Sequence, residues 1–437
     1  MSQKKLLAVN LNEFNLKFLR YGAKKYNCQN IKKLLKLKKI STFSIDKTQD
    51  KDLDPWVQSI SINSGKRSKE HGIFNLGEKI TKNIFQIWDY LSHKRKYSAI
   101  WGPMNTKFKN NKYVKIFVPD PWNYQTDLKP KELKAIYNLA RSYAQNYSDL
   151  SLIKNVPNFI NFFLFTIKRK IIFKLLYSVP SYLKIIFKNG ISNYFLFFLF
   201  DIISLHTFEK ISKNHNIDFS LIFLNSLAHF QHNNWDNKKY EKDYFYFSDQ
   251  ILKIIFQISR AYDSLIIYNG FSQKKINAEY MIRPRNPEKF FKIYGIKFKK
   301  FHSNMTNGAL ITFRNKFSLK NQLKKIENMN VLGFKLLETK VINSNQIFCR
   351  FQIRSKINFS AEIINKQNIK KSFFYEDKQK NIIKNIDNNI FKFLKNIYFI
   401  KTTSKHISKG SLFYQNLKIN ENTIENIKIN KIIKDYF

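Results

Sequence analysis

The chain has 437 residues, of which 43% are hydrophobic, enough for one large domain or for two to three smaller ones. Its formal net charge is +46 and its pI is about 10.0, values that ordinarily indicate nucleic acid or an anionic membrane as a partner. The basic residues form no single block or tail, and the abundance of Lys, Asn, Ile, Phe and Tyr along the whole chain is typical of an AT-rich genome, so nucleic-acid binding is not predicted.

The first predicted elements are a buried strand over Leu6–Leu11 and a helix over 14–26. Asp54 followed by Pro55 is a typical helix start, and Gly65 is a typical helix end. Further along, the pattern predicts a helix at 78–91, a short strand at 98–101 and an irregular loop at 117–122.

Residues 128–215 are predicted to be helical and to form an insertion between sheet strands. Within them, residues 162–200 are very apolar with Lys and Arg interleaved, but the longest uncharged part, 189–200, is shorter than the ~18 residues that a membrane-spanning helix needs. Two interpretations remain open: a helical cap packed on the core, or a basic amphipathic surface at about 155–205 that contacts an anionic membrane peripherally.

The rest of the chain alternates strands and helices, except that residues 310–400 mix short strands and helices with poor periodicity. This alternation predicts an α/β fold with a mainly parallel central sheet flanked by helices. The predicted α/β domain comprises 1–127 and 216–437, and the helical insertion comprises 128–215. The predicted strands cover 218–223, 264–268, 411–414 and the segment from 423, and the predicted helices cover 249–261 and 430–436.

Cysteine usage and the N-terminal sequence bear on the compartment. Cys28 and Cys349 are far apart in sequence and predict neither a disulfide framework nor a thiolate metal site. The apolar run that begins at Leu6 is too short for the core of a signal peptide. We therefore expect a cytoplasmic protein, with peripheral membrane contact as the alternative raised by residues 155–205.

Two of the eight histidines lie three residues apart, just after the apolar run 218–223. His229 and His232 therefore follow the carboxyl end of a buried strand, where open α/β sheets hold their chemistry. Imidazole there binds a metal or transfers protons. The alternative is that both are ordinary loop histidines hydrogen-bonded to their neighbours.

The order of these segments resembles the alkaline-phosphatase-like superfamily, and within it the type I phosphodiesterase/nucleotide pyrophosphatase branch. The resemblance extends over nearly the whole chain. Its supporting segments are Ser64-Gly65 with Glu70-His71-Gly72-Ile73, Asn225-x-x-x-His229, and Lys405-His406 with Lys409-Gly410-Ser411-Leu412. These segments are similar, in turn, to the family's segment after the nucleophile helix, its Asp-x-x-x-His metal motif and its last metal histidine.

The resemblance implies a hydrolase of phosphate, phosphodiester, sulfate or phosphonate groups that uses two zinc ions. The family's first metal-binding carboxylate corresponds to Asn12 in this sequence, with Glu13 adjacent. The family's nucleophile corresponds to Pro55, which follows Asp54. The aspartate of its Asp-x-x-x-His motif falls on Asn225, and the second metal pair falls on Tyr268 and Asn269. His71 matches a position that we interpret as structural.

At most one metal site is therefore predicted, with zinc or another divalent cation held by Glu13, His229, His232 and His406. Asp54 is the candidate catalytic residue. Asn12, Asn225, Asn269 and Arg283 are candidates for binding the anionic ester, and the loop 117–122 is expected near the mouth of the site.

Two functions remain open at this point. The first is a divergent hydrolase of a small phosphate, phosphodiester or sulfate ester. The second is a catalytically degenerate member of the family that binds an anionic ligand, a partner or a lipid headgroup without turnover.

Overall fold

The computed structural model describes residues 4–46, 53–80, 83–123, 127–145, 152–303, 308–331, 334–351, 357–358, 374–375 and 396–437. The chain divides into two compact units: Met1–Ala144, Ser151–Lys275 and Ser404–Phe437 form the first, and Gln145–Leu150 with Ile276–Thr403 form the second. Two paired strands, β7 (Ser272–Pro284) and β16 (Ile397–Ile407), each contain a boundary between the units. The domain limits predicted at 127/128 and 215/216 stay predictions.

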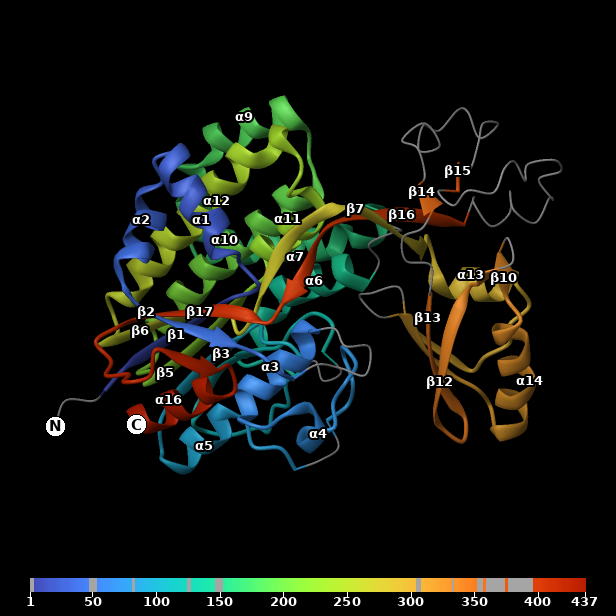
Figure 1. Ribbon diagram of the computed structural model, residues 1–437. Coiled ribbons are helices and arrows are strands. Elements are labelled where there is room, and N and C mark those ends of the chain that lie inside the picture. Colours follow the sequence, from blue (N-terminus) through green and yellow to red (C-terminus); the bar gives the residue numbers. More distant parts are fainter. Residues whose placement is uncertain are drawn as a thin grey trace. The chain divides into compact units, whose positions relative to one another are not determined.

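An eight-stranded, mainly parallel sheet forms the centre of the first unit (Figure 1). Its strands are β1 (Leu6–Leu11), β2 (Lys38–Phe43), β3 (Ser98–Trp101), β4 (Val114–Val118), β5 (Phe219–Leu224), β6 (Ser264–Tyr268), β17 (Lys409–Gln415) and β18 (Thr423–Glu425). They lie in the order β18-β2-β17-β6-β1-β5-β3-β4, and β17 is antiparallel to both neighbours. The predicted α/β class with a mainly parallel central sheet is confirmed.

The register of the three central strands positions the site. Strand β1 pairs in parallel with β5 and β6, so Leu11 lies opposite Leu224 and Asn10 lies opposite Tyr268. The carboxyl ends of these strands therefore meet at one edge of the sheet. Polar residues follow each of the three strands at that edge.

Helices cover both faces of this sheet (Figure 1). They are α1 (Leu16–Lys25), α2 (Gln29–Lys36), α3 (Pro55–Ser64), α4 (Ser68–His71), α5 (Ile87–His93), the 3-10 turn Lys131–Leu133, α6 (Lys134–Gln145), α7 (Leu152–Lys168), α8 (Ile171–Leu176), α9 (Val179–Asn189), α10 (Asn193–Ser212), α11 (Ser226–Asn234), α12 (Lys238–Ser259) and α16 (Lys428–Tyr436). Side chains of a strand alternate between the two faces. Leu7, Val9 and Leu11 accordingly pack with α1, α2, α10 and α12, whereas Leu6 and Ala8 pack with α5 and α16.

The second unit has its own antiparallel sheet, in the order β12-β13-β9-β8. Its buried core includes Phe290, Ile311 and Ile347. Its elements are α13 (Pro287–Ile293), β8 (Lys300–Ser303), β9 (Gly308–Thr312), α14 (Lys316–Glu327), β10 (Asn330–Val331), β11 (Phe334–Lys335), β12 (Leu337–Asn343), β13 (Gln346–Phe351), β14 (Ile357–Asn358) and β15 (Phe374–Tyr375).

Several predicted bounds need correction. The helix predicted at 78–91 begins only at Ile87, because Asp89 accepts a hydrogen bond from the backbone N–H of Gln86 at 2.9 Å and so caps the helix there. Residues 117–118 belong to β4 rather than to a loop, and α12 begins at Lys238 rather than at 249. Across the described ranges, none of the helices combines the length and the apolarity needed to span a membrane.

Candidate metal centre

Glu13 lies in the turn that follows β1, at the carboxyl edge of the sheet. Its backbone is left-handed, with φ of 55°, a conformation that is uncommon for a residue other than glycine and that often marks functional sites. The side chain is buried, with 1% of the residue exposed. The turn therefore aims a carboxylate into the protein.

Two histidines from distant segments converge on this carboxylate. His232 Nε2 lies 3.0 Å from Glu13 Oε2, and His406 Nε2 lies 2.9 Å from the same oxygen. His232 is on α11, after β5, and His406 is near the end of β16. One ligand atom from each of the three residues lies within 4.8 Å of the other two. We call Glu13, His232 and His406 the Glu-His-His cluster.

The electrostatics of the cluster favour an ionised carboxylate. Burial by itself raises the pKa of Glu13, but the charges and hydrogen bonds of His406 and His232 outweigh burial and bring that pKa well below its usual range. Glu13 therefore carries a full negative charge at neutral pH.

Gln273 and Ser404 form a second layer around the cluster. The side-chain amide of Gln273 donates to Glu13 Oε2 at 2.5 Å, and the Ser404 hydroxyl donates to Gln273 Oε1 at 2.7 Å. Because that hydroxyl proton goes to Gln273, Ser404 Oγ acts as an acceptor for the Nδ1–H of His232 at 3.2 Å. With Nδ1 protonated, Nε2 of His232 donates to Glu13 when the ring is charged and would offer its lone pair to a bound cation when the ring is neutral.

A line of amides connects the cluster to the second histidine of the predicted pair. Asn12 Nδ2 lies 2.9 Å from Glu13 Oε1 and 2.7 Å from Asn225 Oδ1, and donates to both. Asn225 Nδ2 lies 3.2 Å from His229 Nε2. The His229 ring stacks on Phe197, with ring centroids 3.8 Å apart. His229 is therefore fixed beside the cluster but does not belong to it.

Helix α11, which carries both histidines, is held at its first turn by a carboxylate from another helix. Asp201 of α10 accepts the backbone N–H of Asn225 at 3.1 Å and that of Ser226 at 2.9 Å. A negative charge at a helix N-terminus is favourable. Burial nevertheless raises the pKa of Asp201 to about 6, against the opposing effect of these hydrogen bonds from Ser226 and Asn225.

The donor set fits a divalent cation. Two imidazole nitrogens aimed at one carboxylate oxygen repel it unless each carries a proton or a cation lies among them. Tetrahedral zinc with bonds of about 2.0–2.2 Å keeps neighbouring ligand atoms about 3.3 Å apart, so the observed 2.9 and 3.0 Å need to open by only a few tenths of an ångström. Two histidines and one glutamate are also a known ligand set of catalytic zinc.

The remaining predicted site residues lie elsewhere. Asp54 is half-buried at the N-cap position of α3 and is not part of the Glu-His-His cluster. Asn269 is buried, and its Nδ2 donates to the carbonyl of Phe14 at 2.6 Å. Its Oδ1 accepts the backbone N–H of Ser411 at 2.6 Å, which connects the end of β6 to β17. Arg283 belongs to the second unit. Their proposed roles stay predictions.

The serines of α3, which follow the predicted nucleophile position, are engaged in the core. The hydroxyl of Ser59 donates to the carbonyl of Met104 at 3.0 Å, and that of Ser64 donates to Ile60 at 2.7 Å. Both residues are buried. Neither hydroxyl is therefore placed to attack a substrate.

Ser61 lies in a buried group that has the composition of a catalytic triad. Ser61 Oγ is 2.6 Å from Asp46 Oδ2 and 3.0 Å from His71 Nε2. His71 Nδ1 accepts the backbone N–H of Ile73 at 3.0 Å, so the ring proton is on Nε2 and points at Ser61. The serine proton therefore goes to the carboxylate and not to the histidine, which is the reverse of a hydrolytic triad. The arrangement supports the structural interpretation of His71.

Asp120, in the loop predicted at 117–122, offers a test by pH. Burial raises its pKa to about 7, although the N–H of Trp122 and the charge of Arg141 oppose the rise. Because the folded state holds its proton more tightly than the unfolded state, stability falls as the pH rises from about 4 to 7 and is level above that. Asp120→Asn has no group that titrates here, so its free energy of unfolding does not show this decrease. Relative to the parent protein, the free energy of unfolding of the variant is therefore expected to rise by about 2–4 kcal/mol between pH 4 and pH 7. Urea unfolding at pH 4–8 measures it, and a difference that does not change with pH would contradict it.

The sequence alone singled out Glu13, His232 and His406, but not Gln273 or Ser404. These two come from long strands, β7 and β16, 131 residues apart, and nothing in their local sequence distinguishes them from other polar strand residues. Asp201 was also missed. It lies on α10 but caps α11, and a capping residue 24 positions before the N-cap of a helix leaves no local sequence signal.

Comparisons with known proteins come from structure only, since neither a family model nor a curated protein matches the chain. The chain is similar to murine ectonucleotide pyrophosphatase/phosphodiesterase 5 (TM-score 0.43, 7% identity, covering 98% of this chain and 94% of that one). It is also similar to alkaline phosphatase from the Antarctic bacterium TAB5 (0.40, 9%, covering 100% and 98%) and to phosphonoacetate hydrolase from Sinorhizobium meliloti 1021 (0.39, 7%, covering 100% and 96%). All three are members of the alkaline-phosphatase-like superfamily, the group that the sequence resembles. Because each TM-score is below 0.5, the description of the fold and of the candidate metal centre rests on this chain's own geometry.

Proposed function

We propose that this protein is a hydrolase of a small anionic ester, of the phosphate, phosphodiester or sulfate class, that uses one divalent cation held by the Glu-His-His cluster. The observation that carries the proposal is the convergence of two imidazole nitrogens on one buried carboxylate oxygen, at 2.9 and 3.0 Å. Three protein ligands leave a coordination position open, as catalytic zinc sites do. The cluster also lies at the carboxyl edge of a parallel sheet, where α/β enzymes place their chemistry.

The cation would supply Lewis acidity and a water of lowered pKa. Glu13 contributes the negative charge that binds the cation, and Asn12 and Gln273 orient its two oxygens by donating to them. Hydrogen bonds connect Asn12, Asn225 and His229 in a row next to the cluster. We assign the orientation of the ester to the two amides, and to His229 the transfer of a proton from the attacking water to the leaving oxygen. Nothing in this assignment requires a side-chain nucleophile, which agrees with Pro55 at the family's nucleophile position.

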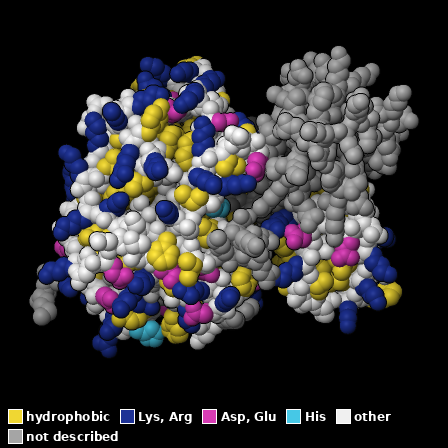
Figure 2. Space-filling model, viewed as in Figure 1, with side chains coloured by type: hydrophobic (Ala, Val, Ile, Leu, Met, Phe, Trp, Pro, Cys, Tyr) yellow, Lys and Arg dark blue, Asp and Glu magenta, His cyan; other side chains and the backbone are white. Residues whose placement is uncertain are grey.

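The surface charge suits an anionic substrate. Lys and Arg side chains are spread over the face that Figure 2 shows, with fewer acidic ones among them. With a formal net charge of +46, the protein attracts anions from solution. We therefore expect turnover of a charged ester to fall steeply as ionic strength rises.

The experiment is metal analysis of protein purified without chelator or affinity histidines, followed by assay with aryl phosphate, phosphodiester and sulfate esters. We expect about one divalent cation per chain. His232→Ala and His406→Ala should each lose it together with any ester hydrolysis, whereas His215→Ala, an exposed histidine after α10, should retain both. Metal that persists in both cluster variants would overturn the proposed site.

A second outcome would favour the degenerate alternative. If the cation is bound and lost as expected but no ester is hydrolysed, the cluster is a binding site without turnover. The absence of the nucleophile hydroxyl from α3 is the observation that favours this alternative.

A further inference from the structure

Helices α7, α8 and α9 present apolar side chains to solvent. On α7 these residues follow the spacing i, i+3, i+4, i+7, i+8 and i+11, which forms one continuous helical stripe. The stripe consists of Val156, Phe159, Ile160, Phe163, Leu164 and Ile167. An exposed apolar stripe of this length is unusual for a helix that faces water.

The next two helices extend the same feature. Phe173 and Leu176 of α8 and Phe187 of α9 are exposed, and Tyr177 between these helices is 95% exposed. Phe187 is 86% exposed. Large aromatic side chains at such exposure bury little apolar area within the fold, which indicates that they contact another surface. We call the exposed apolar residues between 156 and 191 the apolar helical surface.

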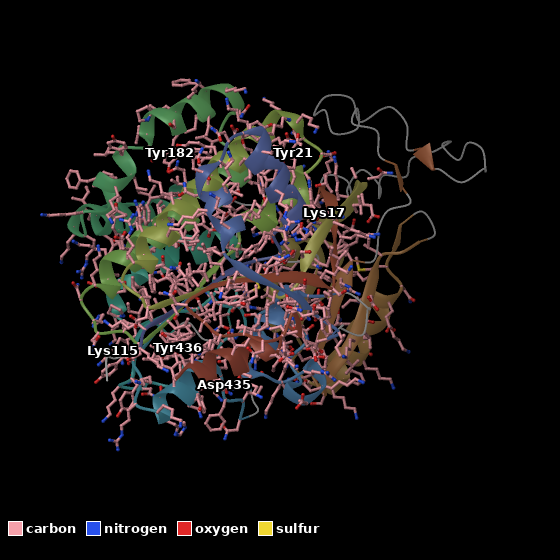
Figure 3. All side chains as sticks on the ribbon, turned by 60° about the vertical axis from the view of Figure 1, so that its left-hand side comes forward. Lys17, Tyr21, Lys115, Tyr182, Asp435 and Tyr436 are labelled. Atoms are coloured by element: carbon pink, nitrogen blue, oxygen red, sulfur yellow. The ribbon has the colours of Figure 1, made fainter. Side chains whose placement is uncertain are left out.

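The opposite sides of these helices are already packed in the core. Phe165 of α7, Ile171 of α8 and Tyr182 and Ile185 of α9 belong to the hydrophobic cluster on that face of the sheet (Tyr182 is labelled in Figure 3). The helices are therefore apolar on two sides, one used by the fold and one not.

The charges of this region identify the occupant. Residues 152–200 contain seven Lys or Arg and no Asp or Glu. Lys168, Lys170, Lys184 and Lys188 are exposed beside the apolar residues. Apolar and aromatic side chains flanked by lysines are complementary to the interface of a membrane that contains anionic lipid. A second copy of the same surface would instead bring cations against cations.

We propose that the apolar helical surface docks the protein peripherally on an anionic membrane, with its aromatic side chains in the headgroup region and its lysines against lipid phosphates. The proposal involves none of the residues of the Glu-His-His cluster, so it does not depend on the proposed hydrolase activity.

The test is co-sedimentation of the full chain with vesicles of phosphatidylcholine, with and without phosphatidylserine. Binding is expected only with phosphatidylserine, and it should weaken as salt rises. Lys184→Gln/Lys188→Gln should weaken it at least roughly tenfold, since each lysine near such a surface contributes about fivefold. Phe163→Ser/Leu164→Ser should weaken it by roughly tenfold or more through loss of apolar burial.

Matched controls separate the surface from general charge and apolarity. Lys38→Gln/Lys39→Gln alters two exposed lysines on β2, and Phe317→Ser alters a 74% exposed phenylalanine on α14. Both should bind vesicles as the parent does. Circular dichroism and thermal unfolding verify that every variant is folded, which is expected because the altered side chains are exposed.

Three results would overturn the proposal. The first is a folded protein that does not sediment with anionic vesicles at low salt. The second is binding that is equally sensitive to the control substitutions. The third is a dimer in analytical ultracentrifugation that Phe163→Ser/Leu164→Ser converts to monomer, because the apolar helical surface would then be covered by a second copy.

Discussion

Glu13→Gln is expected to abolish metal uptake while the fold persists. The substitution keeps the shape of the side chain but removes the charge that both imidazoles face at 2.9 and 3.0 Å. Loss of an outer-shell partner of a metal site costs about 10–100-fold in affinity, so loss of the charged ligand itself should exceed that range. Titration of metal-free protein with zinc measures the effect, and ester hydrolysis should fall in parallel.

Two further variants serve as comparisons for Glu13→Gln, one with a smaller expected effect on metal affinity and one with none. Ser404→Ala removes no residue of the Glu-His-His cluster but takes away the acceptor of His232 Nδ1 and the donor to Gln273 Oε1, and it should weaken metal binding by about 10–100-fold. Glu241→Gln alters another buried carboxylate, paired with Lys25 at 2.8 Å, and should leave metal affinity unchanged. If Glu13→Gln binds zinc as tightly as Glu241→Gln does, the Glu-His-His cluster is an ion pair of the fold and no metal centre.

Asp46→Ala is expected to produce the largest loss of stability. Asp46 is buried and accepts the hydroxyl of Ser61 at 2.6 Å, the backbone N–H of Ser68 at 2.8 Å and the hydroxyl of Ser68. Removal leaves three donors in the core without this acceptor, and breaking a buried charged network costs about 3–5 kcal/mol. Urea unfolding should show a decrease in the free energy of unfolding of that order.

The same variant tests whether the Ser61 group is structural. Well below its lowered unfolding temperature, Asp46→Ala should retain the metal and its activity toward esters, because the Glu-His-His cluster does not use this carboxylate. Asp435→Ala, an exposed position on α16 (Figure 3), is the matched control and should be neutral in both respects. Selective loss of hydrolysis in folded Asp46→Ala would instead make the Ser61 group catalytic.

The sheet was predictable because its strands carry their own signals. Residues 6–9 and 265–268 are continuous apolar runs, as expected for strands that are buried on both faces. The start of α3 at Pro55 and its end at Gly65, which has φ of 70°, follow equally from local backbone chemistry. Strand β2 was missed because it begins with two exposed lysines and only Ile40 and Thr42 within it are buried.

The candidate site was only half predictable, for a different reason. Glu13 and the histidines could be named because each is a scarce or charged residue at the end of an element. Which histidine joins Glu13 could not be read from the sequence, since His229 and His232 are three apart on α11 and the choice depends on how that helix is rotated. The structure turns His232 to Glu13 and His229 to Asn225 and Phe197.

The bonds from α10 to α11 bear on how the protein can be dissected. Asp201 caps the helix of His229 and His232, and Phe197 supports the His229 ring, so both lie within the stretch 128–215. A shortened chain without that stretch would expose the first N–H groups of α11 and free the imidazoles. Removal of the whole stretch would therefore disturb the proposed metal centre together with the proposed docking surface. A shorter deletion confined to α7–α9 would keep Asp201 and Phe197, which belong to α10, and so could test the two proposals separately.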